Sequence, residues 1–386
     1  MNIRIGAVEH FYNAIGVAIV KLDDEVKIGD VLLFLGHTTD LTQVVCSIEI
    51  EHQKIVQAYP GGLVAIKVDE PVRVGDEVFK LDEEAGDPQN IVLWKQMGRT
   101  LEVIFLTYQP VFTEFINSNH LADQSVGILL AAVSVEPGML SPEQLQLRGP
   151  YTSATTWMTR LHAAADKGFL TEPEPGEFRL SRKGSAKVHQ LIADSRKSMT
   201  QADPLDAQDA DRLAVLLQQL VQSCLMTTPP PDTWSIRLAY QLMPGLLPPM
   251  PYIEQALSCL NGYRDDAHLA AWQAEGLTAP AIEVLTLIWR GETNSLDGLY
   301  DSLAFRGFER HDYATTLIDL VEKGLINDAG SHLQLTPNGK EFRQHIEDKT
   351  NQYFFAPWKC LSAVEKTELS CLLSTLREGL QTTTPA

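Results

Sequence analysis

The chain contains an internal repeat, and this repeat limits the possible folds more than any other feature of the sequence. The segment Leu161–Leu170 matches Leu317–Ile326, with Gly168 aligned to Gly324 at an offset of 156 residues. Two further pairs of segments share this offset, 126–129 with 282–285 and 212–220 with 368–376. Three separate matches at one offset indicate that one structural unit occurs twice. Apolar residues recur at helical spacing in both copies, so both are expected to be mainly helical.

Each copy has the element order of a winged helix, in which three helices precede a two-stranded hairpin, the wing, and a further helix. In the first copy Ser141 and Pro142 have the residue types of a helix cap and a first helical residue. Gly168 ends the candidate recognition helix 152–167, and a proline- and glycine-rich tip at 172–176 divides the wing. The second copy repeats the pattern, with helices expected at 278–289, 295–305 and 310–323 and a wing turn at Ala329–Gly330.

The first ninety residues have a different pattern, in which polar turns separate short apolar runs. Two turns repeat a phrase, Val26–Asp30 and Val72–Asp76, where glycine permits a tight turn and aspartate can bond the turn backbone. Many short strands with glycine turns favour a closed barrel, because closure removes exposed sheet edges. Strands are expected at 16–22, 31–35, 42–50, 63–68 and 77–81.

Three segments of this region, GVAIVKLDDEVKIGDVLLFLG, IEIEHQKIVQAYPGGLVAIKV and VRVGDEVF, carry a likeness to a known family. They resemble the second-domain β-barrel of elongation factor Tu and related translation GTPases. They are also similar to stand-alone elongation-factor-like proteins and to the barrel appended to collagenase-like peptidases. The resemblance covers about residues 1–85 and implies contact with RNA or with a protein partner. The chain has no G-x-x-x-x-G-K-[ST] motif to bind nucleotide phosphates, so GTP is not an expected ligand.

A second likeness covers roughly residues 98–380. Its motifs are the phrase L-T-x-x-G after the second wing, YRDDAHL at 263–269 and FFAPW at 354–358. The region resembles the MarR family of regulators and, more narrowly, a tandem helix-turn-helix family found in actinobacteria. MarR proteins dimerise through terminal helices, so two units in one chain imply an intramolecular pseudo-dimer. The shared helical body would include 101–116, 213–220 and 369–376.

The expected fold is therefore multidomain, with a small N-terminal all-β barrel followed by a mainly α body that contains two winged-helix units. The expected divisions are a barrel at 1–85, a linker at 86–97, a first winged-helix unit with flanking helices at 98–228 and a second at 229–386. No run of eighteen apolar residues occurs, and the start MNIRIGAVEH is unlike a signal peptide. A cytoplasmic protein without membrane contact is expected.

The distribution of charge favours nucleic-acid contact by the first unit only. The net charge is -19, and the barrel region 1–90 holds 7 Lys and Arg against 16 Asp and Glu. Residues 120–200 contain 9 Lys and Arg against 8 Asp and Glu, whereas residues 278–348 contain 6 Lys and Arg against 12 Asp and Glu. The second set is therefore less suited to nucleic acid, because carboxylates repel phosphate. The second unit is therefore expected to be structural or to bind protein. The candidate DNA contacts are Arg148, Thr155, Thr156, Arg160, Arg179, Arg182 and Lys183, and a solvated face is the alternative.

The MarR resemblance also implies a small apolar ligand between the helical body and a winged unit. The expected lining of such a pocket is Trp157, Tyr353, Phe354, Phe355 and Trp358, although core packing is the usual reason for aromatic residues at helical spacing.

The segment Arg264–His268 has two interpretations. Two adjacent acids beside a histidine suggest acid–base chemistry. The favoured interpretation is that Asp265 or Asp266 caps a helix that starts there, with Arg264 paired locally.

The cysteines and histidines predict neither a metal site nor a cofactor. The five cysteines are far apart without a C-x-x-C pair, so they are interpreted as buried apolar residues of a reducing compartment. No H-x-x-x-H or H-E-x-x-H occurs, and no nucleophile elbow or catalytic order of residues is found. The chain is therefore expected not to be an enzyme.

Three functions are consistent with these observations. The favoured one is a MarR-like transcription regulator that responds to a ligand or partner and contacts duplex DNA through the first unit. The second is a protein-interaction scaffold whose winged helices have lost DNA contact. The third, an adaptor that binds RNA or the translation machinery, rests on the barrel alone and is the least favoured.

Overall fold

The computed structural model describes residues 2–81, 87–328 and 332–383. Contacts between Cα atoms divide the chain into two units. The barrel unit consists of residues 1–107, 200–220 and 358–386, and the repeat unit consists of residues 108–199 and 221–357. No helix in the described part of the chain is long and apolar enough to cross a membrane.

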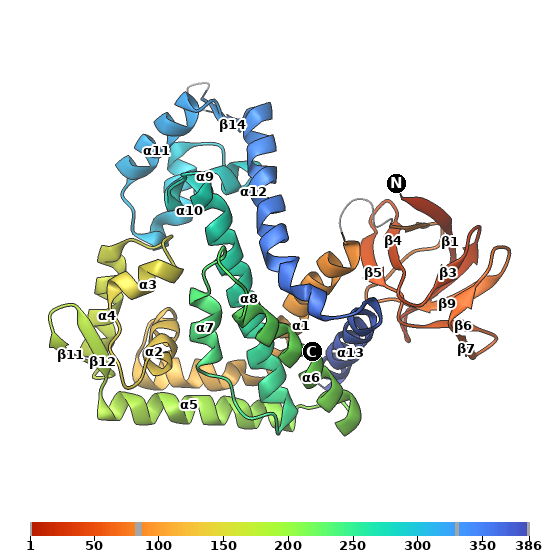
Figure 1. The fold of residues 1–386 in the computed structure, drawn as a ribbon, viewed down its shortest axis with the longest axis horizontal. Helices are drawn as coiled ribbons and strands as arrows, with labels where there is room; N and C mark the ends of the chain where they lie inside the picture. The colour runs from red at the N-terminus through yellow and green to blue at the C-terminus, as the bar shows by residue number, and fades with distance from the viewer. Residues whose placement is uncertain (1, 82–86, 329–331, 384–386) are drawn as a thin grey trace. The chain divides into compact units, whose positions relative to one another are not determined.

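The barrel unit begins with an antiparallel eight-stranded sheet in the order β5-β4-β10-β1-β2-β9-β6-β7, and β3 pairs with β8 (Figure 1). In β2, Ala18, Val20 and Leu22 are buried, as expected when alternate side chains face a core. The strands are β1 Ile3–Tyr12, β2 Val17–Leu22, β3 Val26–Lys27, β4 Val31–Leu35, β5 Asp40–Val44, β6 Ile48–Ile50, β7 Gln53–Ile55, β8 Gln57–Ala58, β9 Leu63–Lys67 and β10 Glu77–Lys80.

Strand β1 was missed by the sequence analysis although it is central in the sheet. Its pairing shifts between Arg4 and Gly6 and again between Val8 and His10. Each irregularity displaces the alternation of apolar and polar residues, so the strand lacks the period of two that identifies the others. The single strand expected at 42–50 is two strands, β5 and β6.

The barrel unit is completed by helix α13 (Ala363–Thr383), by most of α6 (Ala207–Leu225) and by the first part of α1 (Pro88–Asn119). The segment 86–97, expected to be a linker, is thus helical from Pro88 onward.

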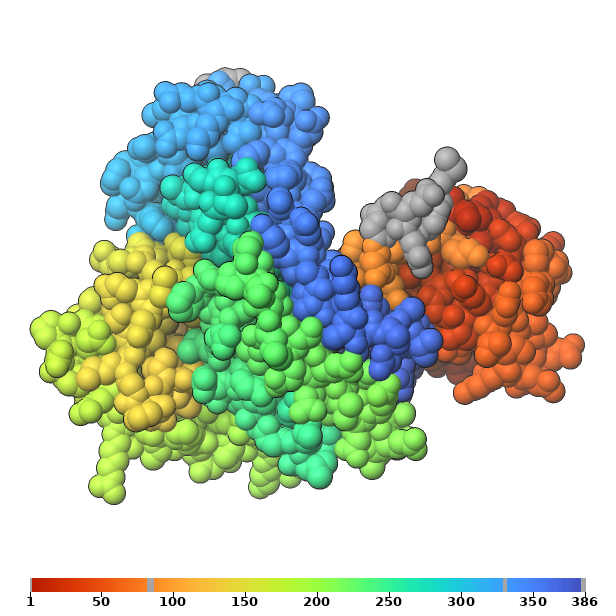
Figure 2. Space-filling view, viewed as in Figure 1, coloured from red at the N-terminus to blue at the C-terminus, as the bar shows by residue number. Residues whose placement is uncertain are grey.

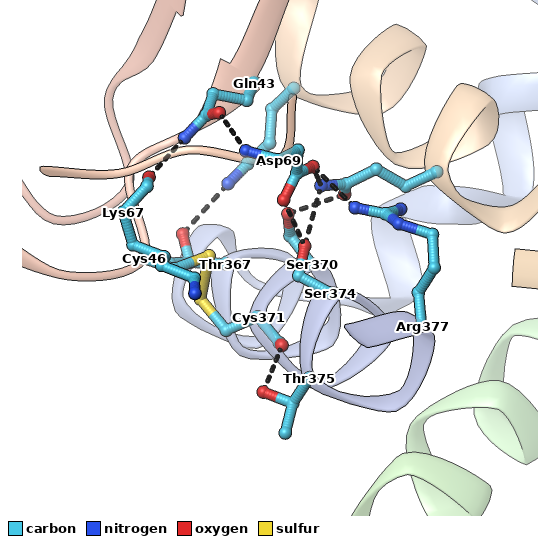
Figure 3. Close-up of a disulfide and its surroundings, with 12 residues drawn as sticks. Gln43, Cys46, Lys67, Asp69, Thr367, Ser370, Cys371, Ser374, Thr375 and Arg377 are labelled. Carbon is cyan, nitrogen blue, oxygen red and sulfur yellow. Dashed lines mark hydrogen bonds and ion pairs between the residues drawn. A yellow bond between two sulfur atoms is a disulfide. The ribbon is translucent and has the colours of Figure 1, made fainter. Parts of the chain in front are cut away.

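A disulfide joins the sheet to α13 in the barrel unit (Figure 3). It links Cys46, which follows β5, to Cys371, so the interpretation of all five cysteines as unpaired was wrong for these two. Next to it, Arg377 forms an ion pair with Asp69 at 2.9 Å, and the two side chains are only 7% and 8% exposed. Ser374 Oγ and Gln96 Nε2 also donate hydrogen bonds to the Asp69 carboxylate, at 3.0 Å and 3.1 Å.

The repeat unit contains the same order of elements twice. We call α2 to α5 the first repeat and α9 to α12 the second repeat. The first consists of α2 Ser125–Ser134, α3 Pro142–Arg148, α4 Ala154–Asp166, β11 Leu170–Glu174, β12 Glu177–Leu180 and α5 Arg182–Gln201. The second consists of α9 Ala279–Trp289, α10 Leu296–Leu303, the short helix η2 Ala304–Arg306, α11 Arg310–Glu322, β13 Ile326–Asp328, β14 Leu333–Leu335 and α12 Pro337–Phe355. The first residue of α11 lies 156 positions after the first residue of α4, and the same is true of their last residues. This is the offset of the sequence repeat.

Two further helices, α7 (Trp234–Tyr240) and α8 (Pro249–Ala274), pack against each other between the two repeats along the chain. The short helix η3 (Ala356–Cys360) follows α12. The wing turn expected at Ala329–Gly330 lies outside the described residues.

The two repeats use the same hydrogen bonds to join the hairpin to its last helix. Ser181 Oγ donates to the carbonyl of Gly168 at 2.7 Å and accepts from the N–H of Gly184 at 2.8 Å. Thr336 Oγ1 makes the two corresponding bonds in the second repeat, at 2.7 Å and 2.9 Å. The hydroxyl therefore satisfies a carbonyl at the end of one helix and an N–H at the start of the next.

The glycine of this motif is required by close approach. A Cβ atom on Gly184 would overlap the carbonyl oxygen of Phe169, and one on Gly339 would overlap the carbonyl oxygen of Leu325. The helix thus begins directly against the chain that enters the hairpin, at a distance which only glycine permits.

Candidate functional site

The repeat unit contains a cavity of about 370 Å³ that is lined by residues of α1, α2, α3, α5, α7 and α8. Most of these helices lie in the yellow and green part of Figure 1. Apolar side chains form much of the wall, including Phe112, Leu130, Ile192, Leu238 and Leu242. Gly127 of α2 enlarges the space, because a Cβ atom there would meet no atom within 4 Å.

Helix α8 supplies a polar stripe to this cavity. Glu254, Ser258, Asn261 and Asp265 line it at spacings of three or four residues, which places them on one face of the helix. At 1.5 Å per residue, the two acids are about 16 Å apart along the axis. The cavity therefore has an acidic side chain at each end of the polar stripe and apolar walls between them.

At the Glu254 end the polar groups are satisfied by one another. The Tyr108 hydroxyl donates to Glu254 Oε1 at 2.9 Å, and Ser258 Oγ donates to the same oxygen at 3.3 Å. Arg196 donates to the carbonyl of Leu242. Burial raises the pKa of Glu254, and the hydrogen bond from Tyr108 opposes that rise.

At the other end, two opposite charges face the cavity without a direct partner. Arg148 and Asp265 both line it, and neither forms a hydrogen bond or an ion pair with another described residue. Burial raises the pKa of Asp265 to about 6, and the positive charges of Arg148 and Arg264 oppose the rise. The side chain is surrounded by protein, yet it is exposed to solvent because it lies on the cavity wall.

The neighbouring Asp266 has a structural role. Its carboxylate accepts hydrogen bonds from the backbone N–H groups of Ser235 and Ile236, at 2.7 Å and 3.0 Å, and so caps the N-terminal end of α7. The sequence analysis expected a cap for a helix that starts at this point. That location was wrong, because Asp265 and Asp266 lie inside α8 and the capped helix is a different one.

Arg264 and His268 point to another part of the structure. Arg264 bonds Glu347 and Asn351 of α12, and His268 Nδ1 lies 3.2 Å from Thr350 Oγ1. Burial lowers the pKa of His268 to about 4, so the imidazole is neutral at neutral pH. Asp265 and His268 are therefore not brought together as an acid–base pair.

The aromatic residues expected to line a ligand pocket do not line this cavity. Trp157 packs on the core of the first repeat, and Tyr353 packs on the core of the second. Phe354 is fully buried against Tyr263, with ring centroids 6.0 Å apart, and it also contacts Phe355. Trp358 is fully buried in the barrel unit.

The seven candidate DNA contacts fall into three groups. Arg179, Arg182 and Lys183 lie together at the junction of β12 and α5, where they are exposed and form no hydrogen bond or ion pair with the described residues. Figure 2 shows their hairpin, in yellow-green, projecting at the edge of the repeat unit. Arg148 instead faces the cavity.

The other three candidates lie on α4, whose first turns contact the second repeat. Arg160 Nη2 donates to the carbonyl of Phe305 at 2.7 Å. Thr156 packs against Gly307, which has a left-handed φ of 74° and no space for a Cβ atom beside the threonine hydroxyl. Thr155 is exposed. Two of the three α4 candidates are thus already engaged within the protein.

A partly buried ion pair of the second repeat lies beside this contact. Arg306 Nη2 lies 2.7 Å from Glu283 Oε1, and its guanidinium stacks over the ring of Tyr151 with 5.5 Å to the centroid. The Arg306 carbonyl also accepts a hydrogen bond from the N–H of Ser153. Burial raises the pKa of Glu283 to about 7, and Arg306 opposes that rise.

The sequence analysis missed the cavity residues Tyr108 and Glu254, and it considered Asp265 for acid–base chemistry or a helix cap rather than for a cavity. One signal was available, because polar residues recur along α8 at 254, 258, 261 and 265, at the spacing of one helix face. The residues of other helices that complete the cavity give no comparable pattern.

Comparison with known proteins finds one family and two relatives. Residues 200–384, slightly less than half of the chain, match the model of a helix-turn-helix family. A stretch of 83 residues, 21% of this chain, is 40% identical to an uncharacterized protease of Methanocaldococcus jannaschii and covers 20% of that protein. Among solved structures, the C-terminal domain of a protein from Geobacillus thermoleovorans named as a U32 peptidase is 26% identical. This match covers 20% of this chain and 92% of that domain, with a TM-score of 0.20.

These findings correct one expectation and support another. The prediction that the chain is not an enzyme is contradicted by its 40% identity, over 83 residues, to a protein that is named as a protease. The chain spans about a fifth of the length of the curated relative it matches. The helix-turn-helix match contains the whole of the second repeat, whereas the sequence analysis placed DNA contact in the first. The chain therefore carries a helix-turn-helix segment at residues 200–384.

Proposed function

We propose that this chain is a winged-helix regulatory protein of the MarR type that binds duplex DNA. The observation that carries the proposal is the helix-turn-helix match over residues 200–384, which covers the second repeat, and the sequence repeat at an offset of 156 residues extends this assignment to the first repeat. The two repeats support it, since each has three helices, a hairpin and a further helix in the order of a winged helix. In this assignment α4 and α11 are the third helices and the two hairpins are the wings.

DNA contact is assigned to the first repeat and to the base of its wing. Arg179, Arg182 and Lys183 are the exposed cations available there. The tip of the same hairpin carries Glu172 and Glu174, which phosphate would repel. The backbone of the nucleic acid is therefore expected to lie along the junction of β12 and α5 rather than at the tip.

The second repeat is assigned to protein contact. The outer face of α11 carries Asp319 and Glu322, which disfavour phosphate. A groove of about 780 Å³ runs along this face, and its apolar residues include Leu296, Ile318 and Val321. Ile318 is 59% exposed and Val321 is 40% exposed, as expected of a surface that a partner covers.

The test is fluorescence anisotropy of the full chain with random-sequence duplex DNA and with bulk transfer RNA over a salt series. Duplex binding is expected to weaken with salt, and each phosphate contact contributes a slope of about -0.9. The variant Arg179→Ala/Arg182→Ala/Lys183→Ala is expected to lose most of this binding. The matched control, Lys95→Ala/Lys323→Ala/Lys340→Ala, removes three exposed cations elsewhere and is expected to retain it.

The other outcomes distinguish the alternatives. Binding to transfer RNA alone would move the function to the barrel and favour an RNA- or translation-associated adaptor. The absence of binding to either nucleic acid at low salt would overturn the DNA proposal and favour a protein-interaction scaffold.

Peptide hydrolysis is a second candidate function, favoured by the 40% identity to a protease. Incubation of the purified chain with unfolded casein, followed by electrophoresis, tests it directly. Casein that remains intact over a day at several pH values would count against this candidate.

A further inference from the structure

The cavity of the repeat unit is built to receive a polar group at one end. Arg148 and Asp265 line that end without forming an ion pair. The charge of each opposes the pKa shift that burial causes in the other. Arg148 is half-buried on the cavity wall, and this burial lowers the pKa of its guanidinium. Asp265 is exposed to solvent on the cavity wall and Arg148 is half-buried, so a molecule bound in the cavity can reach both charges and pair with them.

The rest of the cavity favours an apolar body. Phe112, Leu130, Ile192 and Leu238 lie on its walls, from helices α1, α2, α5 and α7. The charged groups at the far end, Glu254 among them, are already bonded to neighbours. A second charged group on the ligand would therefore find no partner there, whereas an apolar group would be covered.

We propose that this cavity binds a small zwitterionic molecule with an apolar body, of the chemistry of an apolar α-amino acid. Its carboxylate would pair with Arg148 and its ammonium group with Asp265. The two protein charges cancel, so a ligand head of no net charge leaves the site neutral. The proposal rests on the cavity alone and does not depend on DNA binding.

Calorimetric titration of the full chain with matched probes tests the head group. The probes form three matched sets, whose apolar groups are indole, phenyl and isobutyl. Each set consists of the α-amino acid, the corresponding amine without the carboxylate, and the corresponding carboxylate without the amine. The amino acids are L-tryptophan, L-phenylalanine and L-leucine. At least one amino acid is expected to bind roughly 10- to 100-fold more tightly than its amine and its carboxylate, because two charge-assisted bonds replace one.

Two variants assign the ends of the head group. Arg148→Met is expected to weaken binding of the amino acid and of the carboxylate while leaving the amine unchanged. Asp265→Asn is expected to weaken binding of the amino acid and of the amine while leaving the carboxylate unchanged. A loss that is equal for all three heads in both variants would overturn the pairing.

Filling the cavity tests its location. Gly127→Leu places a side chain in open space on the cavity wall, and it is expected to abolish binding of every probe. Gly98→Leu is the matched control, since Gly98 is also a helical glycine with nothing within 4 Å, but it lies in the barrel unit. Thermal unfolding followed by circular dichroism checks that both variants fold. Failure of every amino acid to bind the folded wild-type chain in preference to its amine and carboxylate would overturn the proposal, as would unchanged binding in a folded Gly127→Leu variant.

Discussion

Replacing Arg377 with methionine is expected to destabilise the barrel unit by about 3 kcal/mol, near the lower end of the range for breaking a buried ion pair. Arg377 lies 2.9 Å from Asp69, and both side chains are less than a tenth exposed. The substitution leaves the Asp69 carboxylate buried without its counter-charge. Ser374 and Gln96 still donate hydrogen bonds to it, which is why the lower end of the range applies.

Urea unfolding followed by circular dichroism measures this effect in a double-mutant cycle of Asp69→Asn, Arg377→Met and the two combined. The combined variant is expected to lose less stability than the sum of the single ones, because it leaves no unpaired charge. Arg99→Met is the matched control. Arg99 pairs with Glu70, next to Asp69 in sequence, but both side chains are about half exposed, so the expected cost is below about 1 kcal/mol.

The urea unfolding should be measured once with reductant and once without it. The disulfide between Cys46 and Cys371 also joins the sheet to α13, so it could mask the effect of the ion pair. The reasoning would be refuted if Arg377→Met cost no more than Arg99→Met under reducing conditions. It would also be refuted if the two single losses simply added in the combined variant.

Four further substitutions are expected to change stability, and each is measured by the same urea unfolding. Gly339→Ala should cost about 1–3 kcal/mol because its Cβ would overlap the Leu325 carbonyl, whereas Gly98→Ala, with open space, should gain about 0.5–1 kcal/mol; equal effects would refute the close-approach argument. Burial raises the pKa of Glu283 from 4.5 to about 7, so the stability this group contributes is fully present below pH 4.5 and is lost as the pH rises through 7. Glu283→Gln should remove that loss, which is on the order of 3 kcal/mol, and a variant that keeps the wild-type pH dependence would assign it to other groups. Cys46→Ser should cost roughly 2–5 kcal/mol without reductant and nothing with it, since a cross-link between residues 325 apart restricts the unfolded chain; an equal cost in both series would point to packing.

Local signals in the sequence were sufficient for much of the fold. Ser141 caps α3 and forms a reciprocal pair of bonds with Gln144, as the Ser-Pro start predicted. Gly168 has a left-handed φ of 76°, as expected of a glycine that ends a helix. These interactions join residues a few positions apart, so the residue types that make them appear together in the sequence.

Interactions between distant residues could not be read in the same way. Cys46 and Cys371 are separated by 325 residues, and only the packing of α13 on the sheet brings them together. Arg148 and Asp265 line one cavity because α3 and α8 both border it. Residue type and spacing describe one element at a time, and neither indicates which elements will be neighbours.

The aromatic residues show the limit of periodicity. Helical spacing correctly indicates that Phe354 faces inward, yet it does not distinguish a face packed on a core from a face that borders a cavity. The cavity is bordered by bulky apolar residues such as Phe112 and Ile192 as well as by Gly127 and the polar residues of α8. A search for bulky apolar residues therefore finds packed cores and cavity walls alike.

The contact between α4 and the residues that follow α10 covers side chains that nucleic acid would need if it bound α4. Arg160 is held by the carbonyl of Phe305, and Thr156 is covered by Gly307. Nucleic acid that reached these side chains would compete with the second repeat for the same surface. By linkage, any factor that strengthens the contact would lower the affinity of α4 for nucleic acid by the same free energy. The second repeat would then act on DNA binding as a competitor that is always present, at an effective concentration fixed by the chain itself.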